Sequence, residues 1–215
     1  MKISGTLFIA FYTTTICADL SASPQICTYQ TFNWSVAQQR PVNFRTVIHP
    51  YSKLTDEEVD PQTGCTVCLE DQQLVKVGKL KPFLVCKKIA DAVQTTLENL
   101  LAAHETVLEV IAYRPGRTRN PLDTNGNRTG FSNHAYGAAI DINRAMNGLY
   151  DNCVQFGPEC QLIQGGPWIP GNPGVLAKDA PIVLGMKQAG LKWGGEIAGK
   201  QKDFMHFSVT GYCCG

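Results

Sequence analysis

Two short stretches of the chain hold the residue types best suited to chemistry. The first, Ser-Asn-His-Ala-Tyr-Gly-Ala-Ala-Ile-Asp, ends at Asp141, and the second, Asp-Phe-Met-His, ends at His206. They supply two imidazoles, from His134 and His206, and two carboxylates, from Asp141 and Asp203. Zinc accepts imidazole nitrogen and carboxylate oxygen, and a catalytic zinc site uses three protein ligands and leaves the fourth position to water. The pattern therefore predicts that His134, Asp141 and His206 bind Zn2+ in a surface cleft.

The remaining carboxylate, on Asp203, is predicted to act in catalysis. It lies three residues before His206, so a metal bound by that histidine would have this carboxylate nearby. A carboxylate within hydrogen-bonding reach of an attacking water can act as its general base. The competing interpretation is that the histidines are ordinary core or surface residues, and residue spacing alone favours that interpretation.

The predicted ligands must be brought together by separate elements. His134 and Asp141 are seven residues apart, which suits a loop residue followed by a strand residue, and this strand is expected over 137–143. His206 must come from a distant strand, expected over 204–209, that pairs beside the first. The small residues at 137–139 would let backbone and substrate approach closely.

Helical spacing of apolar residues predicts the main helix over Pro82–Ala103, with the proline in its first turn. A second helix is expected to begin at Asp179 as N-cap, with Pro181 in the first turn, and to end at Gly190. Further strands are expected over 42–49, 74–77, 106–113 and 191–193, a polar loop over 117–130, and a surface loop over 147–174. Because helices and strands do not alternate strictly, the predicted fold is α+β, with a mostly antiparallel sheet packed against helices.

The 215-residue chain is expected to begin with a secretory signal peptide over 1–22, because a lysine, an apolar stretch and small residues follow in that order. The apolar stretch is shorter than the ~20 residues that span a bilayer. The mature chain is divided into a cysteine-bearing extension, 23–80, and a second domain, 81–215. A net charge of +1 without a basic run argues against electrostatic binding to nucleic acid or to an anionic membrane. No other segment is long and apolar enough to span a bilayer, so no membrane insertion is expected after signal removal. The protein is expected to be secreted and to act as a monomer.

The cysteine count agrees with export. Of nine cysteines one, Cys17, lies in the predicted signal, and the even number that remains indicates disulfides, whose connectivity the sequence leaves open. Cys153 and Cys160 could pin the loop over 147–174. Cys65 and Cys68 also have the spacing of a redox-active pair or of half a zinc site, but structural disulfides are favoured in an exported chain.

The combined pattern Ser-x-His-x-x-Gly-x-Ala-x-Asp, Trp-Gly-Gly and Asp-x-x-His-Phe resembles the D-alanyl-D-alanine carboxypeptidase and L-alanyl-D-glutamate peptidase family of zinc peptidases. The resemblance covers roughly residues 82–210 and rests on Ser132, His134, Gly137, Ala139, Asp141, Trp193, Gly194, Gly195, Asp203, His206 and Phe207. It implies that His134, Asp141 and His206 hold zinc and that Asp203 is the catalytic carboxylate. Asp203 stands where several relatives have glutamate, a difference that favours an endopeptidase.

The resemblance also assigns roles around the metal. The family places an arginine after an upstream strand, often in a Tyr-Arg step, and Arg114 follows Tyr113 here. Arg114 would then stabilise a substrate or transition-state oxygen, while Ser132 and Trp193 would shape the substrate-binding cleft. The implied function is hydrolysis of stem peptides of bacterial peptidoglycan, at D-Ala-D-Ala or L-Ala-D-Glu bonds. The alternative is a non-catalytic extracellular zinc-binding module of the same fold, serving as a binding or signalling domain.

Overall fold

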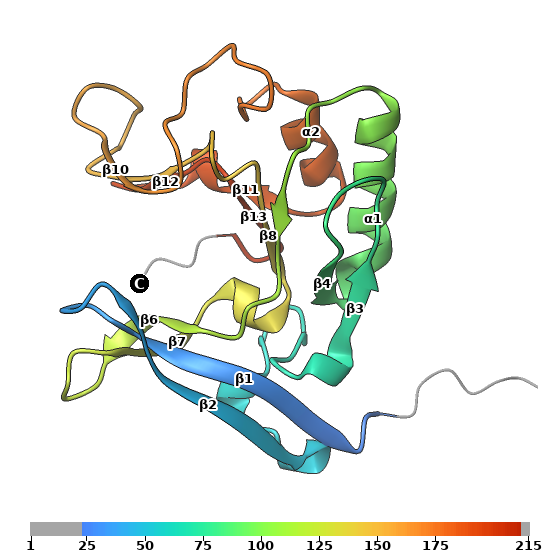
Figure 1. Ribbon diagram of the computed structural model, residues 1–215, viewed down its shortest axis with the longest axis vertical. Helices are drawn as coiled ribbons and strands as arrows, with labels where there is room; N and C mark the ends of the chain where they lie inside the picture. Colours follow the sequence, from blue (N-terminus) through green and yellow to red (C-terminus); the bar gives the residue numbers. More distant parts are fainter. Residues whose placement is uncertain (1–22, 212–215) are drawn as a thin grey trace, which may run out of the picture.

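The computed structural model describes residues 23–211, so the predicted signal peptide, Cys213 and Cys214 lie outside the described residues. The α+β prediction is confirmed, with two α-helices and several sheets in the described residues (Figure 1). The α-helices are α1 (Lys87–Ala102) and α2 (Pro181–Gln188). The short 3-10 helices are η1 (Tyr51–Lys53), η2 (Asp56–Glu58), η3 (Leu69–Asp71), η4 (Asn133–Tyr136) and η5 (Gly194–Glu196). No helix within 23–211 has the length and apolar character needed to cross a membrane.

A central antiparallel sheet carries two of the predicted ligands. Its strand order is β11 (Lys192–Trp193), β13 (His206–Ser208), β8 (Ala139–Ile142) and β5 (Val110–Ile111). In the pairing of β13 with β8, His206 lies directly opposite Asp141. The strands predicted over 137–143 and 204–209 are thus confirmed in substance, although the strand predicted over 106–113 contains only the two residues of β5.

The two α-helices pack together and help to bury this sheet (Figure 1). On α1 the residues Ala90, Val93, Leu97 and Leu100 recur at helical spacing and are all buried. The predicted start of this helix at Pro82 was wrong, because β4 (Phe83–Cys86) pairs with β3 (Gln72–Val75) and two of its residues, Phe83 and Val85, alternate into the core. In α2, Pro181 occupies the first turn as expected, but Ala180 and not Asp179 is the N-cap.

A second sheet joins the N-terminal extension to the second predicted domain. Its order is β2 (Arg40–Pro50), β1 (Ile26–Ser35), β6 (Arg117–Leu122) and β7 (Arg128–Phe131), and all pairs are antiparallel except β1 with β6. Residues 117–130, predicted as a polar loop, therefore form most of a hairpin. These two strands were not recognised in the sequence because they are largely polar and lack an alternating apolar pattern. In the structure, their pairing is also interrupted by register shifts.

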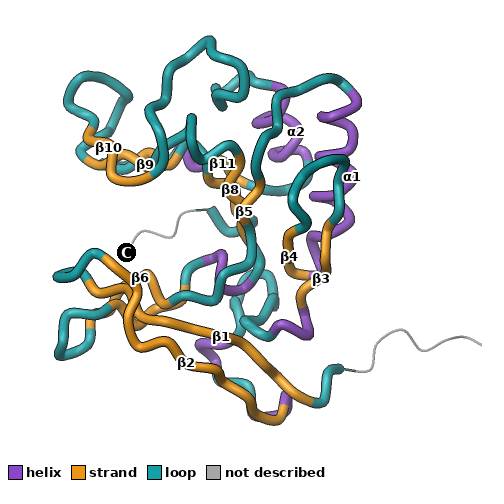
Figure 2. The backbone as a smooth tube through the Cα atoms, viewed as in Figure 1, coloured by secondary structure: helices purple, strands orange, loops and turns teal. Residues whose placement is uncertain are grey.

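A third sheet and an aromatic cluster organise the loop predicted over 147–174. Its strand order is β10 (Gln161–Gln164), β9 (Leu149–Asp151) and β12 (Lys202–Asp203). Beyond these strands the segment leading to α2 is irregular, as the teal tube of Figure 2 shows. Trp168 anchors it by stacking on Phe204, with ring centroids 4.1 Å apart. The Cys153–Cys160 disulfide closes the β9–β10 connection, as expected.

All six cysteines within 23–211 form disulfides, and these are Cys27–Cys68, Cys65–Cys86 and Cys153–Cys160. Cys65 and Cys68 bond to different partners, so they are structural and not a redox-active pair. Two Asn-x-Ser/Thr sites, at Asn33 and Asn127, are buried, and their amide nitrogens donate hydrogen bonds to Arg128 O and Asp123 Oδ2. A glycan on either nitrogen would have to replace one hydrogen of an amide that is largely buried in this fold.

Glu58 is a buried carboxylate that ties the β1–β2 hairpin to η2. It accepts hydrogen bonds from Tyr29 Oη at 2.7 Å, from the Thr55 backbone at 2.8 Å, and lies 2.9 Å from His49 Nε2. Burial by itself would raise the pKa of Glu58, but the bonds from Thr55, Tyr29 and His49 outweigh it and lower the pKa to about 2. A carboxylate with a depressed pKa stabilises the fold fully above its unfolded pKa and loses that contribution as the pH falls.

We therefore expect acid to weaken this part of the fold through Glu58. From its ordinary pKa of 4.5 down to about 2, the free energy of unfolding should fall by about 3 kcal/mol from this residue. Urea unfolding between pH 5 and pH 2 would measure it, and the Glu58→Gln variant should lack that part of the pH dependence. An identical pH dependence in the two proteins would contradict the assignment to Glu58.

Candidate metal centre

Three predicted ligands meet in one buried cluster. His134 Nε2, Asp141 Oδ1 and His206 Nδ1 form a nearly equilateral triangle, with separations of 3.1 Å, 3.1 Å and 3.2 Å. The first comes from η4, the second from β8 and the third from β13, and all three residues are at most 4% exposed. Residues that are up to 72 positions apart in the chain thus point their donor atoms at one place.

The backbone fixes which nitrogen of His134 faces the cluster. Nδ1 lies 2.9 Å from the carbonyl oxygen of Ala112. A carbonyl can only accept, so Nδ1 donates to it, and Nε2 is the nitrogen that faces Asp141 and His206 and could bind a metal. Metal-binding histidines are commonly oriented in this way by a backbone acceptor. Ala112 carried no chemical signal in the sequence, because its contribution is a main-chain oxygen.

The central carboxylate is held in its charged form. Burial would raise the pKa of Asp141, but the adjacent imidazoles of His134 and His206 hold it well below its usual value. Its other oxygen, Oδ2, accepts a hydrogen bond from Arg114 Nη2 at 2.9 Å. Arg114 is half-buried and lies beside the cluster, where its bond to Asp141 orients a predicted ligand.

The donor set fits a zinc ion. With bonds of about 2.0–2.1 Å in a tetrahedral arrangement, neighbouring ligand atoms of zinc are about 3.3 Å apart. The observed separations of 3.1–3.2 Å are close to that value, and two imidazoles with one carboxylate are zinc-type ligands. These three side chains supply three ligands, which is the number found in catalytic sites.

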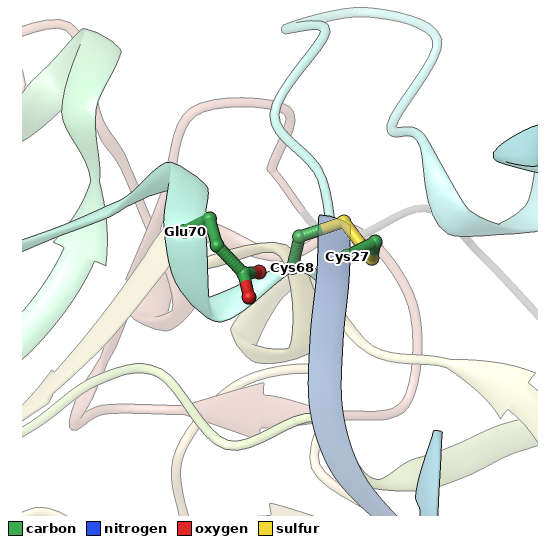
Figure 3. Close-up of side chains that lie close together, drawn as sticks. All are labelled: Cys27, Cys68 and Glu70. Atoms are coloured by element: carbon green, nitrogen blue, oxygen red, sulfur yellow. A yellow bond between two sulfur atoms is a disulfide. The ribbon is translucent and has the colours of Figure 1, made fainter. Parts of the chain in front are cut away.

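Two further groups of possible ligand residues are not metal sites. One contains Cys27, Cys68 and Glu70, and the other contains Cys27, His49 and Glu58. The sulfur atoms of Cys27 and Cys68 are joined in a disulfide, as the yellow bond in Figure 3 shows, so neither is a thiolate. Glu70, drawn beside them, accepts a hydrogen bond from the Thr28 backbone at 2.9 Å.

Asp203 lies on β12, close to the cluster in sequence but outside the three-ligand group. It is 5% exposed, and β12 pairs with β9 through Asp203 and Leu149. On the other side Gly194 packs so tightly that a Cβ there would lie 2.2 Å from the Asp203 carbonyl oxygen. The Trp-Gly-Gly motif therefore has a steric reason, because a side chain at its first glycine would displace this strand.

Ser132 and Trp193, the predicted cleft residues, are both buried. Ser132 precedes η4, and its carbonyl accepts a hydrogen bond from Ala135 N at 2.8 Å. Trp193 donates from Nε1 to the Phe204 carbonyl at 2.8 Å, which fixes the indole. A cavity of about 310 Å³ adjoins His206 and is lined by Lys192, Trp193, Gly194, Glu196, Ile197, Ala198, His206, Thr210 and Gly211.

Comparison with known proteins finds a family resemblance in the part of the chain that holds this cluster. Residues 125–209 match a family model described as D-alanyl-D-alanine carboxypeptidase. The resemblance to this family is confirmed over that segment. His134, Asp141, Asp203 and His206 all lie within the match, whereas Arg114 and the whole N-terminal extension lie outside it. No curated protein and no solved structure matches the chain.

Arg114 can be tested as an outer partner of the metal-ligand set. In Arg114→Ala, Asp141 loses the bond to Oδ2, and outer partners of metal ligands typically contribute 10-fold to about 100-fold in affinity. We expect zinc affinity to fall about 10-fold, as measured by competition with a chromogenic chelator.

The same variant separates the two roles considered for Arg114. If this residue acts only on the substrate or transition state, zinc affinity should stay unchanged while kcat/KM falls. Arg119→Ala, which alters another arginine on the neighbouring strand β6, is the matched control and should leave zinc affinity as it is.

Proposed function

We propose that this protein is a secreted zinc peptidase that hydrolyses stem peptides of bacterial peptidoglycan. The observation that carries the proposal is the triangle of His134, Asp141 and His206 within a segment that matches the D-alanyl-D-alanine carboxypeptidase family. At the family level, this match supports a peptidase that acts on peptidoglycan. The bonds under consideration are D-Ala-D-Ala and L-Ala-D-Glu.

In the proposed reaction each residue has a defined task. A bound zinc ion would lower the pKa of water to about 7 and polarise the scissile carbonyl. His134, Asp141 and His206 hold that ion, and the Ala112 carbonyl keeps His134 in the required tautomer. Asp203 accepts the proton of the attacking water and returns it to the leaving amine nitrogen. Arg114 fixes Asp141 and is available to a substrate oxygen.

The cavity beside His206 would receive part of the substrate. It is bounded by Trp193, whose indole is fixed by its bond to Phe204, and by charged residues such as Lys192 and Glu196. Ser132 stands immediately before the turn that carries His134. These placements support the proposal that Ser132 and Trp193 shape the cleft.

Export fits the disulfides. Three disulfides are typical of an oxidising environment, and the N-terminal sequence predicts a signal peptide. We therefore propose that the protein works outside the cell as a monomer. Its net charge of +1 supports neither nucleic acid nor anionic membrane as a partner.

The direct test is to incubate the purified protein with bacterial cell walls and to measure newly formed amine termini. We expect them to accumulate, to stop with a chelator and to resume when zinc is restored. Mass analysis of fragments from defined muropeptides would identify the bond that is cut. Stoichiometric zinc binding without any new amine termini would instead support the alternative, a non-catalytic zinc-binding module.

A further inference from the structure

The turn that carries His134, residues 133–137, is supported by chain that lies outside the matched family segment. Its last residue, Gly137, has φ +65° and accepts a hydrogen bond from Cys86 N at 2.9 Å. A Cβ on Gly137 would lie 2.0 Å from Gln72 Oε1 and 2.6 Å from Cys86 N. Gln72 and Cys86, which precede the matched segment in the chain, therefore contact the last residue of this turn directly.

Gln72 is itself fixed from behind. Its Nε2 donates to the carbonyl oxygens of Thr66 and Cys68 at 3.0 Å and 3.1 Å. The amide that contacts Gly137 thus cannot swing away without losing two buried hydrogen bonds.

Ala135 and Tyr136, in the middle of the turn, make further contacts with the N-terminal part of the chain. Ala135 is fully buried in a cluster with Cys27, Tyr29, Val67, Cys68 and Phe131. Tyr136 Oη donates to the Glu57 carbonyl at 2.8 Å. The Glu57 carboxylate in turn binds Arg117 through two hydrogen bonds of 2.9 Å and 2.7 Å, which anchors this contact to the second sheet.

Two disulfides connect these supports covalently. Cys65–Cys86 links the segment around Thr66 to the residue that binds Gly137, and Cys27–Cys68 links β1 to the residue that binds Gln72. Arg114 N donates to the His134 carbonyl at 3.0 Å, and the neighbouring Tyr113 Oη donates to Val67 O at 2.6 Å. The turn that carries His134 and the Tyr113–Arg114 segment that binds its carbonyl therefore both contact residues 57–86.

We propose that the disulfide-linked segment 27–86 positions His134 for metal binding through Gln72, the Cys65–Cys86 disulfide and the hydrogen bond of Tyr136 to Glu57. Zinc affinity then depends on this segment although it supplies no ligand. The reason is geometric, because the His134 ring must keep Nε2 within the small triangle that it forms with Asp141 and His206. The proposal rests on the proposed zinc site and extends the metal-binding unit well beyond the family segment.

The test compares two double variants that each remove one disulfide. Cys65→Ala with Cys86→Ala removes the support, and Cys153→Ala with Cys160→Ala removes a disulfide in the β9–β10 connection as the matched control. Zinc dissociation constants are measured by chelator competition on the folded, metal-free proteins. We expect zinc affinity about 10-fold weaker or more in the first variant and unchanged in the second. Hydrogen exchange of residues 133–137 should also be faster in the first.

Two milder variants serve if the first one does not fold. Tyr136→Phe removes only the bond to Glu57, and Gln72→Met removes the buried amide while keeping the side-chain length. Each should weaken zinc affinity several-fold in protein that circular dichroism shows to be folded. Zinc affinity equal to that of the unaltered protein in all folded variants would overturn the positioning role and leave the proposed function standing. Failure of the unaltered protein to bind zinc would overturn both.

Discussion

Replacing His206 with alanine is expected to remove zinc and peptidase activity together. The imidazole Nδ1 is one of three donor atoms in the cluster, and alanine leaves only His134 and Asp141. If the binding free energy of a protein zinc site is divided equally among its ligands, each ligand contributes at least about 100-fold in zinc affinity. Zinc content by atomic absorption and the release of amine termini from cell walls should therefore fall in parallel.

The control for this change is His104→Ala, which removes an exposed imidazole that follows α1. That variant should keep both zinc and activity. Normal zinc content in the folded His206→Ala protein would exclude this residue as a ligand. Loss of activity with zinc retained would place His206 in substrate binding instead.

Replacing Asp203 with alanine is expected to separate metal binding from catalysis. Asp203 is outside the three-ligand group, so the variant should bind zinc as tightly as the unaltered protein. Without a general base the turnover number should fall by about 100-fold or more. The measurements are zinc stoichiometry and kcat on a defined muropeptide at saturating substrate.

Because Asp203 is buried, its replacement needs two controls. Asp203→Asn preserves the shape of the side chain and should be as inactive as the alanine variant if proton transfer is what is lost. Asp151→Ala, on β9 of the same sheet, removes a half-exposed carboxylate and should keep full turnover. Full activity in Asp203→Asn would remove this residue from the mechanism.

Together these variants divide the candidate site into parts with different readouts. The role of His206 is tested by zinc content, and the role of Asp203 by the turnover number at constant zinc content. The role of Arg114 is tested by comparing the loss of zinc affinity with the loss of kcat/KM. The family match covers the first two residues but not Arg114, so the match lends no support to a role for Arg114. Its bond to Asp141 makes an effect on zinc affinity the expected outcome.

The sequence alone was sufficient to select the candidate ligands. Residue type and spacing are local properties, and the motifs around His134, Asp141 and His206, together with their resemblance to a zinc peptidase family, indicated these side chains as candidate ligands. The apolar spacing on α1 and the even number of cysteines after the predicted signal peptide can likewise be recognised without long-range contacts. The α+β class and the Cys153–Cys160 disulfide followed from such signals.

Only the tertiary structure decided how those residues meet. The register that sets His206 opposite Asp141 joins strands 65 residues apart, and no local pattern encodes such a pairing. The start of α1 was misplaced for the same reason, since β4 exists through its pairing with β3. Two supports of His134 are main-chain atoms, the Ala112 carbonyl and the Cys86 N–H, and their role depends on position and not on side-chain type.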